Sequence, residues 1–376
     1  MTESRQIILV GAGLSNGLLA DRLLALKPDL DLLVLEGGDA PGGNHTWCFH
    51  DSDVEPTAMA WLAPYVSARW QQHDVAFPSF ARTLPGTYNA IRSDDFAKRV
   101  SERLGSRLKV RTRVKSVKAN SVVLEDGTEL QARAVIDGRG GMGDELGCGY
   151  QKFVGQELRL TAPHGLARPM LMDASVPQLD GFRFVYVLPW DERTVLVEDT
   201  RYSDTPDIDA PAFREDIARY VQARGWRVES VVREELAALP IPLRGERPVH
   251  RRPVIGVQGG FFHATTGYSV PFAVELAELL ARLPSLDAAV LTRVLDEHAR
   301  DHWQAMGFFR VLNRMLFRGA EPTGRVTVFE SFYRHSPELI ARFYAGRLTW
   351  GDKLRALQRG APTVPAGRAM RAALFG

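Results

Sequence analysis

The chain has 376 residues, of which 45% are hydrophobic and 24% charged, and a net charge of +2, which excludes a disordered or fibrous protein. At about 150 residues per domain, this length predicts two domains or one large domain with insertions. The two cysteines, Cys48 and Cys148, show neither disulfide nor zinc spacing, which favours a reducing compartment. The apolar run from Ile7 to Val10 is too short for a signal peptide, so we expect a cytoplasmic protein.

The first forty residues have the pattern of a βαβ unit. A β-branched, apolar run from Gln6 to Val10 ends at Gly11-Ala12-Gly13, and leucines at helical spacing follow. A second strand, Asp31 to Glu36, ends in an acid that stands where the hydroxyls of a ribose are recognised. The glycines allow a pyrophosphate to approach the N-terminus of the helix. The third position of the glycine fingerprint is Asn16, where Gly or Ala is usual.

This unit predicts a dinucleotide site formed by Gly11, Gly13, Leu14 and Glu36. An acid at the end of the second strand favours FAD or NAD over NADP. FAD is favoured further because the fingerprint opens the chain and because Gly42 and Gly43 follow the acid, where two-domain flavoproteins place a glycine pair near the cofactor.

The rest of the chain alternates strands and helices. Residues 40–90 are rich in Pro, Gly, Trp and His and predict loops rather than a regular layer. The elements predicted after them are a helix at 94–104, strands at 108–114, 121–124, 129–133 and 134–137, a hairpin at 182–200, a helix at 214–224, a strand at 254–257, and helices at 273–283 and 286–307.

Two glycine-rich turns extend the predicted cofactor site. Asp137-Gly138 follows a strand and resembles the Asp-Gly turn that aromatic hydroxylases use for flavin and NADPH. Gly260, Gly267 and Tyr268 precede a helix and offer backbone donors near the flavin end of a cofactor. The uncharged stretch around them, Pro253 to Val274, has too many glycines and polar side chains to be a membrane span.

These elements predict an α/β fold, with a Rossmann-like FAD-binding domain, an antiparallel β substrate domain and C-terminal helices, as in two-domain flavoproteins of the hydroxylase and glutathione reductase kind. The expected division of the chain is 1–150 for the first part of the FAD-binding domain, 151–245 for the substrate domain, 246–285 for the return to the first domain, and 286–376 for a helical segment.

That last segment is basic and aromatic. From Arg310 onward, twelve Lys and Arg stand against four Asp and Glu, interleaved with Phe, Tyr and Trp. Such a composition favours contact with an anionic membrane surface, while a plain solvated face and nucleic-acid binding are the alternatives.

Over nearly its whole length the sequence resembles the flavin-dependent lycopene β-cyclases of the bacterial type. The acid that usually contacts the flavin ribitol near the C-terminal motif is missing, and Gln258 or Gly259 stands in its place. The motifs that carry the resemblance are Gly11–Leu14, Gly42–Trp47, Val135–Gly140, Leu196–Tyr202, Thr265–Ser269, Phe332–Arg334 and Arg342–Leu348.

The resemblance implies a reaction without net redox change. Each acyclic end of lycopene is protonated, a carbocation closes a ring, and a proton leaves, which gives β-carotene by way of γ-carotene. It implies reduced FAD as the active cofactor and NAD(P)H as its reductant. It also implies lycopene and other carotenoids as ligands, peripheral membrane contact through the C-terminal segment, contact with other carotenoid-pathway enzymes, and no nucleic acid.

Glu198 is the first candidate for the acid/base, because the matching glutamate of the family is linked to activity. A glutamate near a hairpin end is otherwise a solvated charge in most proteins. On a strand, Glu198 and Asp199 point to opposite faces, so only one of them can face a pocket. Asp199, Glu235 and His45 are less favoured candidates, and no pair of residues has the spacing of a metal site.

Two other classes of function stay open. A flavin monooxygenase or desaturase that acts on an isoprenoid would oxidise NADPH in step with product formation. A noncatalytic flavin- or carotenoid-binding protein would keep all its function when Glu198 is replaced by Gln.

Overall fold

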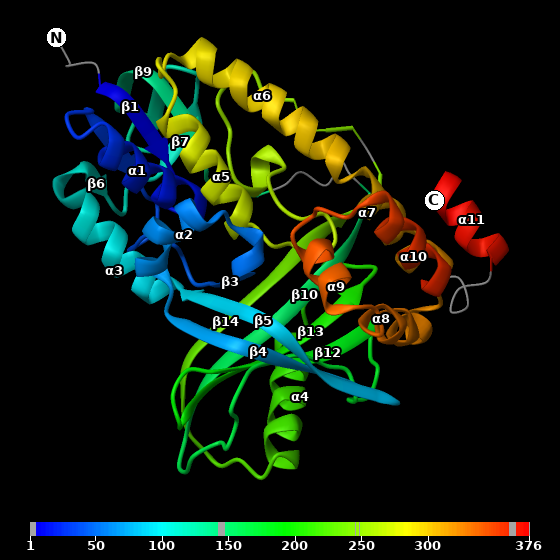
Figure 1. Ribbon diagram of the computed structural model, residues 1–376. Helices are drawn as coiled ribbons and strands as arrows, with labels where there is room; N and C mark the ends of the chain where they lie inside the picture. Colours follow the sequence, from blue (N-terminus) through cyan, green and yellow to red (C-terminus); the bar gives the residue numbers. More distant parts are fainter. Residues whose placement is uncertain (1–4, 142–146, 245, 248, 361–365, 376) are drawn as a thin grey trace.

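The computed structural model describes residues 5–141, 147–244, 246–247, 249–360 and 366–375 (Figure 1). Two β-sheets lie one above the other in this view, with helices on their outer faces and a group of helices at one side. This architecture confirms the α/β fold that the sequence predicts. The expected segments 286–376 and 151–245 each include positions outside the described residues, namely 361–365 and 376 in the first and 245 in the second.

The first sheet is built around β1, which pairs in parallel with β2 on one side and β9 on the other. Its parallel strands are apolar on both faces, as expected for strands buried on both sides. In spatial order the strands are β6 (Leu108–Lys109), β2 (Leu32–Leu35), β1 (Arg5–Val10), β9 (Glu129–Asp137), β8 (Ser121–Leu124) and β7 (Val114–Val117).

Two helices, α1 (Leu14–Leu26) and α5 (Val270–Ala281), lie side by side on one face of this sheet (Figure 1). Ile7 and Leu9 of β1 pack among their leucines and alanines, whereas Ile8 packs on the other face against the β7–β8 hairpin. The helix at 94–104 is confirmed as α3 (Ser93–Leu104) and packs against α1.

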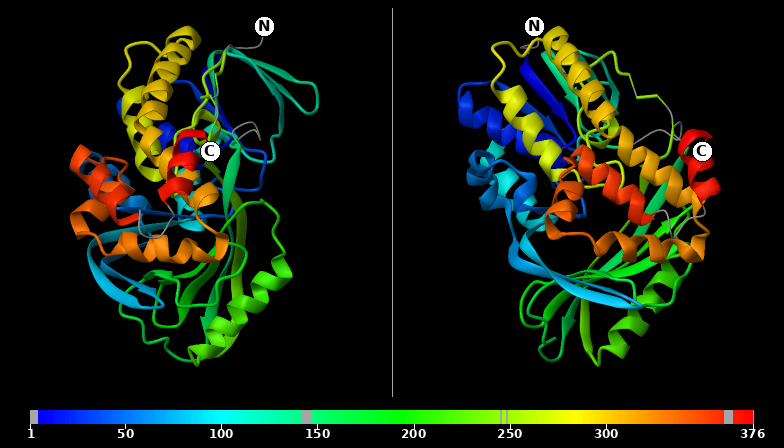
Figure 2. Two further views of the ribbon diagram at one scale, coloured as in Figure 1. Left: turned by 90° about the vertical axis from the view of Figure 1, so that its right-hand side faces the viewer. Right: turned by 45° about the vertical axis from the view of Figure 1, so that its right-hand side comes forward.

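The second sheet has eight strands and is antiparallel except where β11 runs parallel to β4. Helix α4 (Ala210–Ala223) covers one of its faces (Figure 2). In spatial order the strands are β14 (Val228–Pro242), β10 (Cys148–Leu160), β13 (Thr194–Ser203), β12 (Phe182–Pro189), β11 (Met170–Asp173), β4 (Ala68–Phe77), β5 (Phe80–Arg92) and β3 (Thr46–His50).

The prediction of loops for residues 40–90 is wrong. This region forms α2 (Pro56–Leu62) and the strands β3, β4 and β5, which extend the second sheet. In the sequence, the residue pair Pro85-Gly86 is typical of a turn. In the structure it lies inside β5, where the pairing with β4 is irregular between Trp70 and Gln72. Proline and glycine are tolerated in strands at bulges, and Gly86 has a φ of 115°, which suits such a position.

The other predicted elements agree with the structure, with two differences of length. The hairpin at 182–200 is β12 and β13, and the long helices are α5 and α6 (Ala288–Ala305). The strand expected at 108–114 is reduced to β6, and Val254 forms only a single parallel bridge to Asp137.

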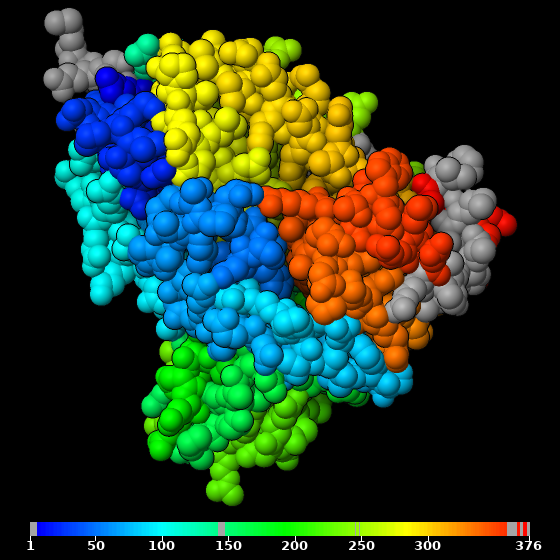
Figure 3. Space-filling model, viewed as in Figure 1, coloured from blue at the N-terminus to red at the C-terminus, as the bar shows by residue number. Residues whose placement is uncertain are grey.

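The C-terminal helices gather at one side of the molecule, against the β4–β5 hairpin (Figure 3). Arg82 of β5 donates hydrogen bonds to the carbonyl oxygens of Tyr333 (3.0 Å) and His335 (2.9 Å). These helices are α7 (Gly307–Arg314), the π-helical turn η6 (Met315–Gly319), α8 (Arg325–Tyr333), α9 (Pro337–Tyr344), α10 (Trp350–Gly360) and α11 (Ala366–Phe375). Across the described part of the chain, no helix combines the length and apolar character that crossing a membrane requires.

Candidate active site and cofactor cleft

A cleft of about 510 Å³ opens at the carboxyl ends of β1, β2 and β9, and we call it the cofactor cleft. Gly13 is the N-cap of helix α1 and provides no side-chain cap. The first turn of the helix also contains no acid, so its first N–H groups can bind an anion. The candidate cofactor residues that line the cleft are Gly11, Gly13, Leu14, Glu36, Gly42, Gly43 and Gly138.

Glu36 is held at the edge of this cleft by two backbone N–H groups. Its Oε2 accepts from Ala12 and its Oε1 from Gly38, both at 2.7 Å. Each carboxylate oxygen can accept more than one hydrogen bond, so the ribose hydroxyls of a dinucleotide still have acceptors there.

The two fingerprint glycines serve different purposes. A Cβ at Gly11, where φ is +83°, would lie 3.0 Å from the carbonyl oxygen of Gly138, so glycine is required where the turns after β1 and β9 approach each other. A Cβ at Gly13 would meet nothing within 4 Å, so its missing side chain leaves open space in the cleft. Asn16 lies beside these turns, and its Nδ2 donates to the carbonyl oxygens of Val10 (2.9 Å) and Gly11 (2.8 Å). The cleft thus fits a dinucleotide such as FAD.

Four predicted cofactor residues, Asp137, Gly260, Gly267 and Tyr268, do not line the cleft. Asp137 is fully buried and its carboxylate pairs with Arg139 (2.9 Å) and Arg252 (3.0 Å). Burial opposes ionisation, but the two arginines prevail and lower the pKa of Asp137. Asp137 therefore fixes the positions of these two arginines, and one of them, Arg139, lines the cleft.

A second cavity, of about 260 Å³, adjoins the cleft and lies against the face of the second sheet that α4 does not cover. We call it the carboxylate cavity, because Glu198 and Glu235 line it. Gly267 and Tyr268, predicted near the flavin end, line this cavity as well. The cleft and the cavity meet at His45, Trp47, Val257 and Ser269, which line both.

Glu198 lies in β13 and faces this cavity. Its Oε1 accepts a hydrogen bond from the hydroxyl of Thr200 at 2.8 Å. Burial, together with the nearby carboxyl of Glu235, raises the pKa of Glu198 to about 8. At neutral pH the side chain is therefore mainly a protonated acid that can donate a proton.

Asp199, the next residue, points to the opposite face, as strand alternation predicts. It is fully buried beneath α4 and bonds to Arg183 (2.6 Å) and Arg201 (3.1 Å), which also bind Asp216. Asp199 is outside the carboxylate cavity and is not exposed to solvent, so its placement corrects the expectation that it is an alternative catalytic acid.

Glu235 lies in β14 and is nearly fully buried, at 3% exposure. Its Oε2 accepts from Arg233 at 3.1 Å, and Arg233 is held in turn by the side chains of Asn44 (2.9 Å) and Thr46 (2.8 Å). Burial raises the pKa of Glu235 although Arg233 opposes this effect. The neighbouring Glu234 faces away and pairs with Arg214, which lowers its pKa.

Hydrogen-bonded tyrosines form another wall of the carboxylate cavity. The hydroxyl of Tyr88 lies 2.8 Å from that of Tyr186 and 2.6 Å from that of Tyr268, and Tyr186 donates to the Sγ of Cys48 at 3.0 Å. Burial raises the pKa of each of these tyrosines well above its ordinary value, so all three stay neutral. Their rings offer a cation the electron-rich faces that stabilise positive charge.

A third, apolar cavity continues from the second one toward the C-terminal helices. Met172, Tyr202, Thr266 and Tyr344 line both cavities. The rest of its wall comes largely from apolar and aromatic side chains of η6, α8 and α9, including Met315, Leu316, Val328, Phe329, Phe332 and Phe343. The aromatic part of the C-terminal segment is therefore largely internal, which its composition alone does not reveal.

Sequence reasoning missed two residues that line the carboxylate cavity, Cys48 and Tyr88, and two that contact its glutamates, Arg233 and Gly155. Cys48 and Tyr88 belong to the region predicted as loops, and Arg233 and Gly155 carry no motif. Of these, Tyr88 had a usable signal, because it lies in the buried end of β5, where Ala90 and Ile91 continue an apolar run.

Comparisons with known proteins agree with this geometry. Residues 6–371 match the model of the lycopene cyclase protein family. A lycopene beta-cyclase from Pseudescherichia vulneris is 46% identical over 98% of this chain and 97% of its own length. Another from Pantoea ananas is 43% identical over 99% of this chain and 98% of its own length.

Solved structures show the same fold at much lower identity. A geranylgeranyl bacteriochlorophyll reductase-like protein from Thermoplasma acidophilum superposes with a TM-score of 0.60 at 11% identity, over 96% of this chain and 98% of its own. A halogenase mutant in complex with FAD gives a TM-score of 0.59 at 13% identity, over 99% of this chain and 85% of its own. The fold is thus that of flavin-dependent enzymes, and the family match together with the curated relatives shows that the chain belongs to the lycopene cyclase family.

Proposed function

We propose that this enzyme is a lycopene β-cyclase, which closes the acyclic ends of lycopene without net oxidation or reduction and yields β-carotene by way of γ-carotene. The observation that carries the proposal is Glu198, a carboxyl group with a pKa raised to about 8 in an aromatic cavity that adjoins a dinucleotide cleft. The names of the curated relatives, lycopene beta-cyclases at 41–46% identity, support the same reaction.

In this proposal Glu198 donates its proton to the terminal double bond of lycopene. The neighbouring double bond of the chain then attacks the resulting cation and closes the ring, while the tyrosine wall of Tyr88, Tyr186 and Tyr268 keeps water away and presents ring faces to the charge. Loss of a proton from the new ring restores a double bond, so the product has the same composition as the substrate.

The cofactor cleft fits FAD, and Gly13, Glu36 and the N-terminus of α1 would hold it. Bound FAD in its reduced, anionic form supplies a negative charge, worth about 4 kcal/mol to a cation at roughly 4 Å and an effective dielectric near 20. NAD(P)H is the proposed reductant, needed to activate the flavin and not consumed in each turnover.

The test is an incubation of the purified holoenzyme with lycopene in liposomes, under anaerobic conditions, with chemically reduced FAD and no nicotinamide. The proposal predicts a cyclised isomer of unchanged mass with a shortened chromophore. A product that is oxygenated or dehydrogenated, and that forms only with NADPH and an electron acceptor, would instead make the protein an isoprenoid oxidoreductase.

Replacing Gly13 by Val is expected to remove FAD without unfolding the protein. Gly13 has φ −70° and ψ −177°, an extended conformation that any residue adopts, and a Cβ there meets only open space. The valine side chain would therefore fill the place of the cofactor. We expect flavin affinity to fall at least about a hundredfold, equivalent to about 2.7 kcal/mol, in a fluorescence titration of the apoprotein.

An unchanged thermal midpoint of the apoprotein is the control for Gly13→Val. Wild-type flavin affinity in this variant would show that the cofactor binds elsewhere.

We also propose that the polyene reaches the carboxylate cavity through the apolar cavity beneath the C-terminal helices, and that these helices rest on the membrane that holds the substrate. The substrate-binding part then comprises the second sheet with β3, β4 and β5, and not residues 151–245 alone.

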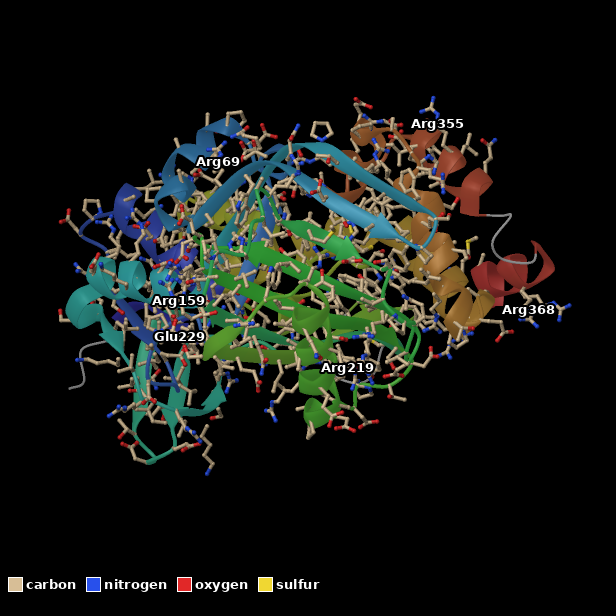
Figure 4. All side chains as sticks on the ribbon, turned by 90° about the horizontal axis from the view of Figure 1, so that it is seen from below. Arg69, Arg159, Arg219, Glu229, Arg355 and Arg368 are labelled. Atoms are coloured by element: carbon tan, nitrogen blue, oxygen red, sulfur yellow. The ribbon has the colours of Figure 1, made fainter. Side chains whose placement is uncertain are left out.

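On α10, Trp350 is 81% exposed and Leu354 is 59% exposed, beside Lys353. Arg355 and Arg368 project from the same end of the molecule (Figure 4).

The variant Trp350→Glu/Leu354→Glu is expected to bind anionic liposomes at least about tenfold more weakly, because each apolar side chain contributes about 1.5–3 kcal/mol when buried in an apolar phase. The measurement is sedimentation with vesicles of phosphatidylglycerol and phosphatidylcholine. Val232→Glu is the matched control, since Val232 is 54% exposed on β14, away from α10 (Figure 1). Equal binding of all three proteins would refute the contact through α10.

A further inference from the structure

Four strands of the second sheet bring one row of residues together at the carboxylate cavity. Tyr186 of β12 pairs with Glu198 of β13, Glu198 pairs with Gly155 of β10, and Gly155 pairs with Glu235 of β14. Directly paired residues point to the same face of a sheet, so Gly155 lies on the same face as Tyr186, Glu198 and Glu235, which line the cavity. The two glutamates are therefore two strands apart, with Gly155 between them.

Gly155 leaves the space that the two glutamates share. Their backbones are about 10 Å apart, which is two strand spacings, and a side chain at the middle position would separate them. A Cβ at Gly155 would lie 3.3 Å from Oε2 of Glu198 and 3.3 Å from Cγ of Glu235. Gly155 has no positive φ, so its backbone does not require glycine, and the space above it is the reason we assign to it.

The two carboxyl groups have different partners. Glu198 is bound by the neutral hydroxyl of Thr200, whereas Glu235 is bound through Oε2 by the guanidinium of Arg233. Oε1 of Glu235 is buried and, among the described residues, has no donor in hydrogen-bonding geometry, although the nearby Thr46 hydroxyl also acts on this carboxyl and opposes the rise of its pKa. A cation beside Glu235 favours its ionised form, and two nearby carboxyls do not readily ionise together. These partners therefore favour a protonated Glu198 beside an ionised Glu235.

We infer that Glu198 and Glu235 act as a donor and acceptor pair across Gly155, in which Glu198 protonates the terminal double bond of the substrate and Oε1 of Glu235 accepts the proton that the new ring loses. This inference rests on the proposed cyclase function and names its second catalytic group. The O–H bond of Glu198 breaks and a C–H bond forms at the chain end. The ring C–C bond then forms from the neighbouring double bond, and a ring C–H bond gives its electrons to the new double bond as its proton passes to Glu235.

The two glutamates together account for both protons that move in the reaction. One proton leaves Glu198 and one arrives at Glu235, so no oxidant or reductant is consumed. Transfer of the proton back across Gly155, directly or through water, restores the starting state. Groups from neighbouring elements influence the pair, and the titratable or charged ones are Arg233, Glu157, Asp199, His45, Cys48, Tyr88, Tyr186, Tyr202, Tyr268 and Tyr344.

The first test compares Glu235→Gln with Glu234→Gln in the FAD-loaded holoenzyme. We expect Glu235→Gln to lower the rate of cyclisation at least about a hundredfold, the usual contribution of an acid or base catalyst. Glu234→Gln, on the adjacent and outward-facing position, should keep the wild-type rate. A rate for Glu235→Gln within threefold of wild type would overturn the pair.

The pH profile supplies a readout that a purely structural role of Glu235 would not change. Because Glu198 must be protonated, the wild-type rate is expected to fall as the pH rises through about 8. Glu235→Gln removes the neighbouring carboxyl that raises this pKa, so the fall of its residual rate should move to lower pH. An unmoved profile would overturn the pair. If Glu235→Gln loses its flavin, Glu235→Asp carries the test, since a shorter acid should recover part of the rate that the amide does not.

Gly155→Ala tests the spacing itself. Its methyl group would press on both glutamates, so we expect kcat to fall about tenfold with little change in KM, in a protein that keeps its flavin. Full activity of Gly155→Ala would refute the role of the shared space. Failure of the wild-type enzyme to yield any cyclised isomer would instead refute the proposed function, so the two failures are distinguishable.

Discussion

Replacing Glu198 by Gln is expected to abolish ring closure while the enzyme keeps its fold and its flavin. The amide still accepts the hydrogen bond from Thr200 and fills the same space, but it has no acidic proton to donate. General acid catalysis contributes about a hundredfold to ten-thousandfold, so we expect the rate of cyclisation to fall by that amount. The measurement is the separation of pigments after incubation with lycopene, with flavin content determined from the absorbance spectrum.

Glu229→Gln is the matched control for this experiment, because Glu229 is an exposed glutamate of β14, near the outer edge of the second sheet (Figure 4). It should turn over at the wild-type rate. Retained turnover by Glu198→Gln would remove Glu198 as the acid. Absence of turnover in the wild type as well, with flavin or carotenoid still bound by both proteins, would favour a binding protein over an enzyme.

Replacing Asp199 by Ala, one residue along the chain, is expected to destabilise the protein by about 3–5 kcal/mol, the usual effect of removing one partner of a buried ion pair. The substitution would leave Arg183 and Arg201 buried beneath α4 with only Asp216 to balance their charges. The free energy of unfolding in guanidinium chloride measures this loss.

Asp29→Ala is the control for stability, because Asp29 is exposed in the turn between α1 and β2 and should change the free energy by less than about 0.5 kcal/mol. A loss below about 1 kcal/mol in Asp199→Ala would contradict the ion-paired network. Two adjacent acids thus have different expected effects, since replacing Glu198 lowers the rate of cyclisation and replacing Asp199 lowers the free energy of unfolding.

The sequence predicts those features that depend on local pattern. The glycine turn of β1 and α1, the acid at Glu36 and the alternation of Glu198 and Asp199 along β13 all follow from residues that are near one another in the chain. Each is set by a single strand, turn or helix, whose periodicity the sequence carries directly.

The rest depends on contacts between distant segments. Glu235 meets Glu198 only because β14 and β13 both pair with β10 in a particular register, and register is set by strand pairing and not by any one strand. The arginines that bind the buried Asp137 likewise include Arg252, which comes from a segment far along the chain. The sequence did not predict β5, because Pro85-Gly86, which lies at an irregularity inside this strand, is typical of turns.

The measurement that tests the central claim most directly is cyclisation in D₂O by the holoenzyme with reduced FAD and unlabelled lycopene. With the enzyme first equilibrated in D₂O and present in excess over lycopene, each carboxyl donates before it can receive a proton back from a ring. Proton donation by the exchanged carboxyl then predicts deuterium in the new ring, at the carbon where the chain end was protonated, with no other change in composition. Glu198→Gln should give almost none of this product. A cyclised product without deuterium, formed at the wild-type rate, would contradict the account, because the proton would then not come from a carboxyl group of the cavity.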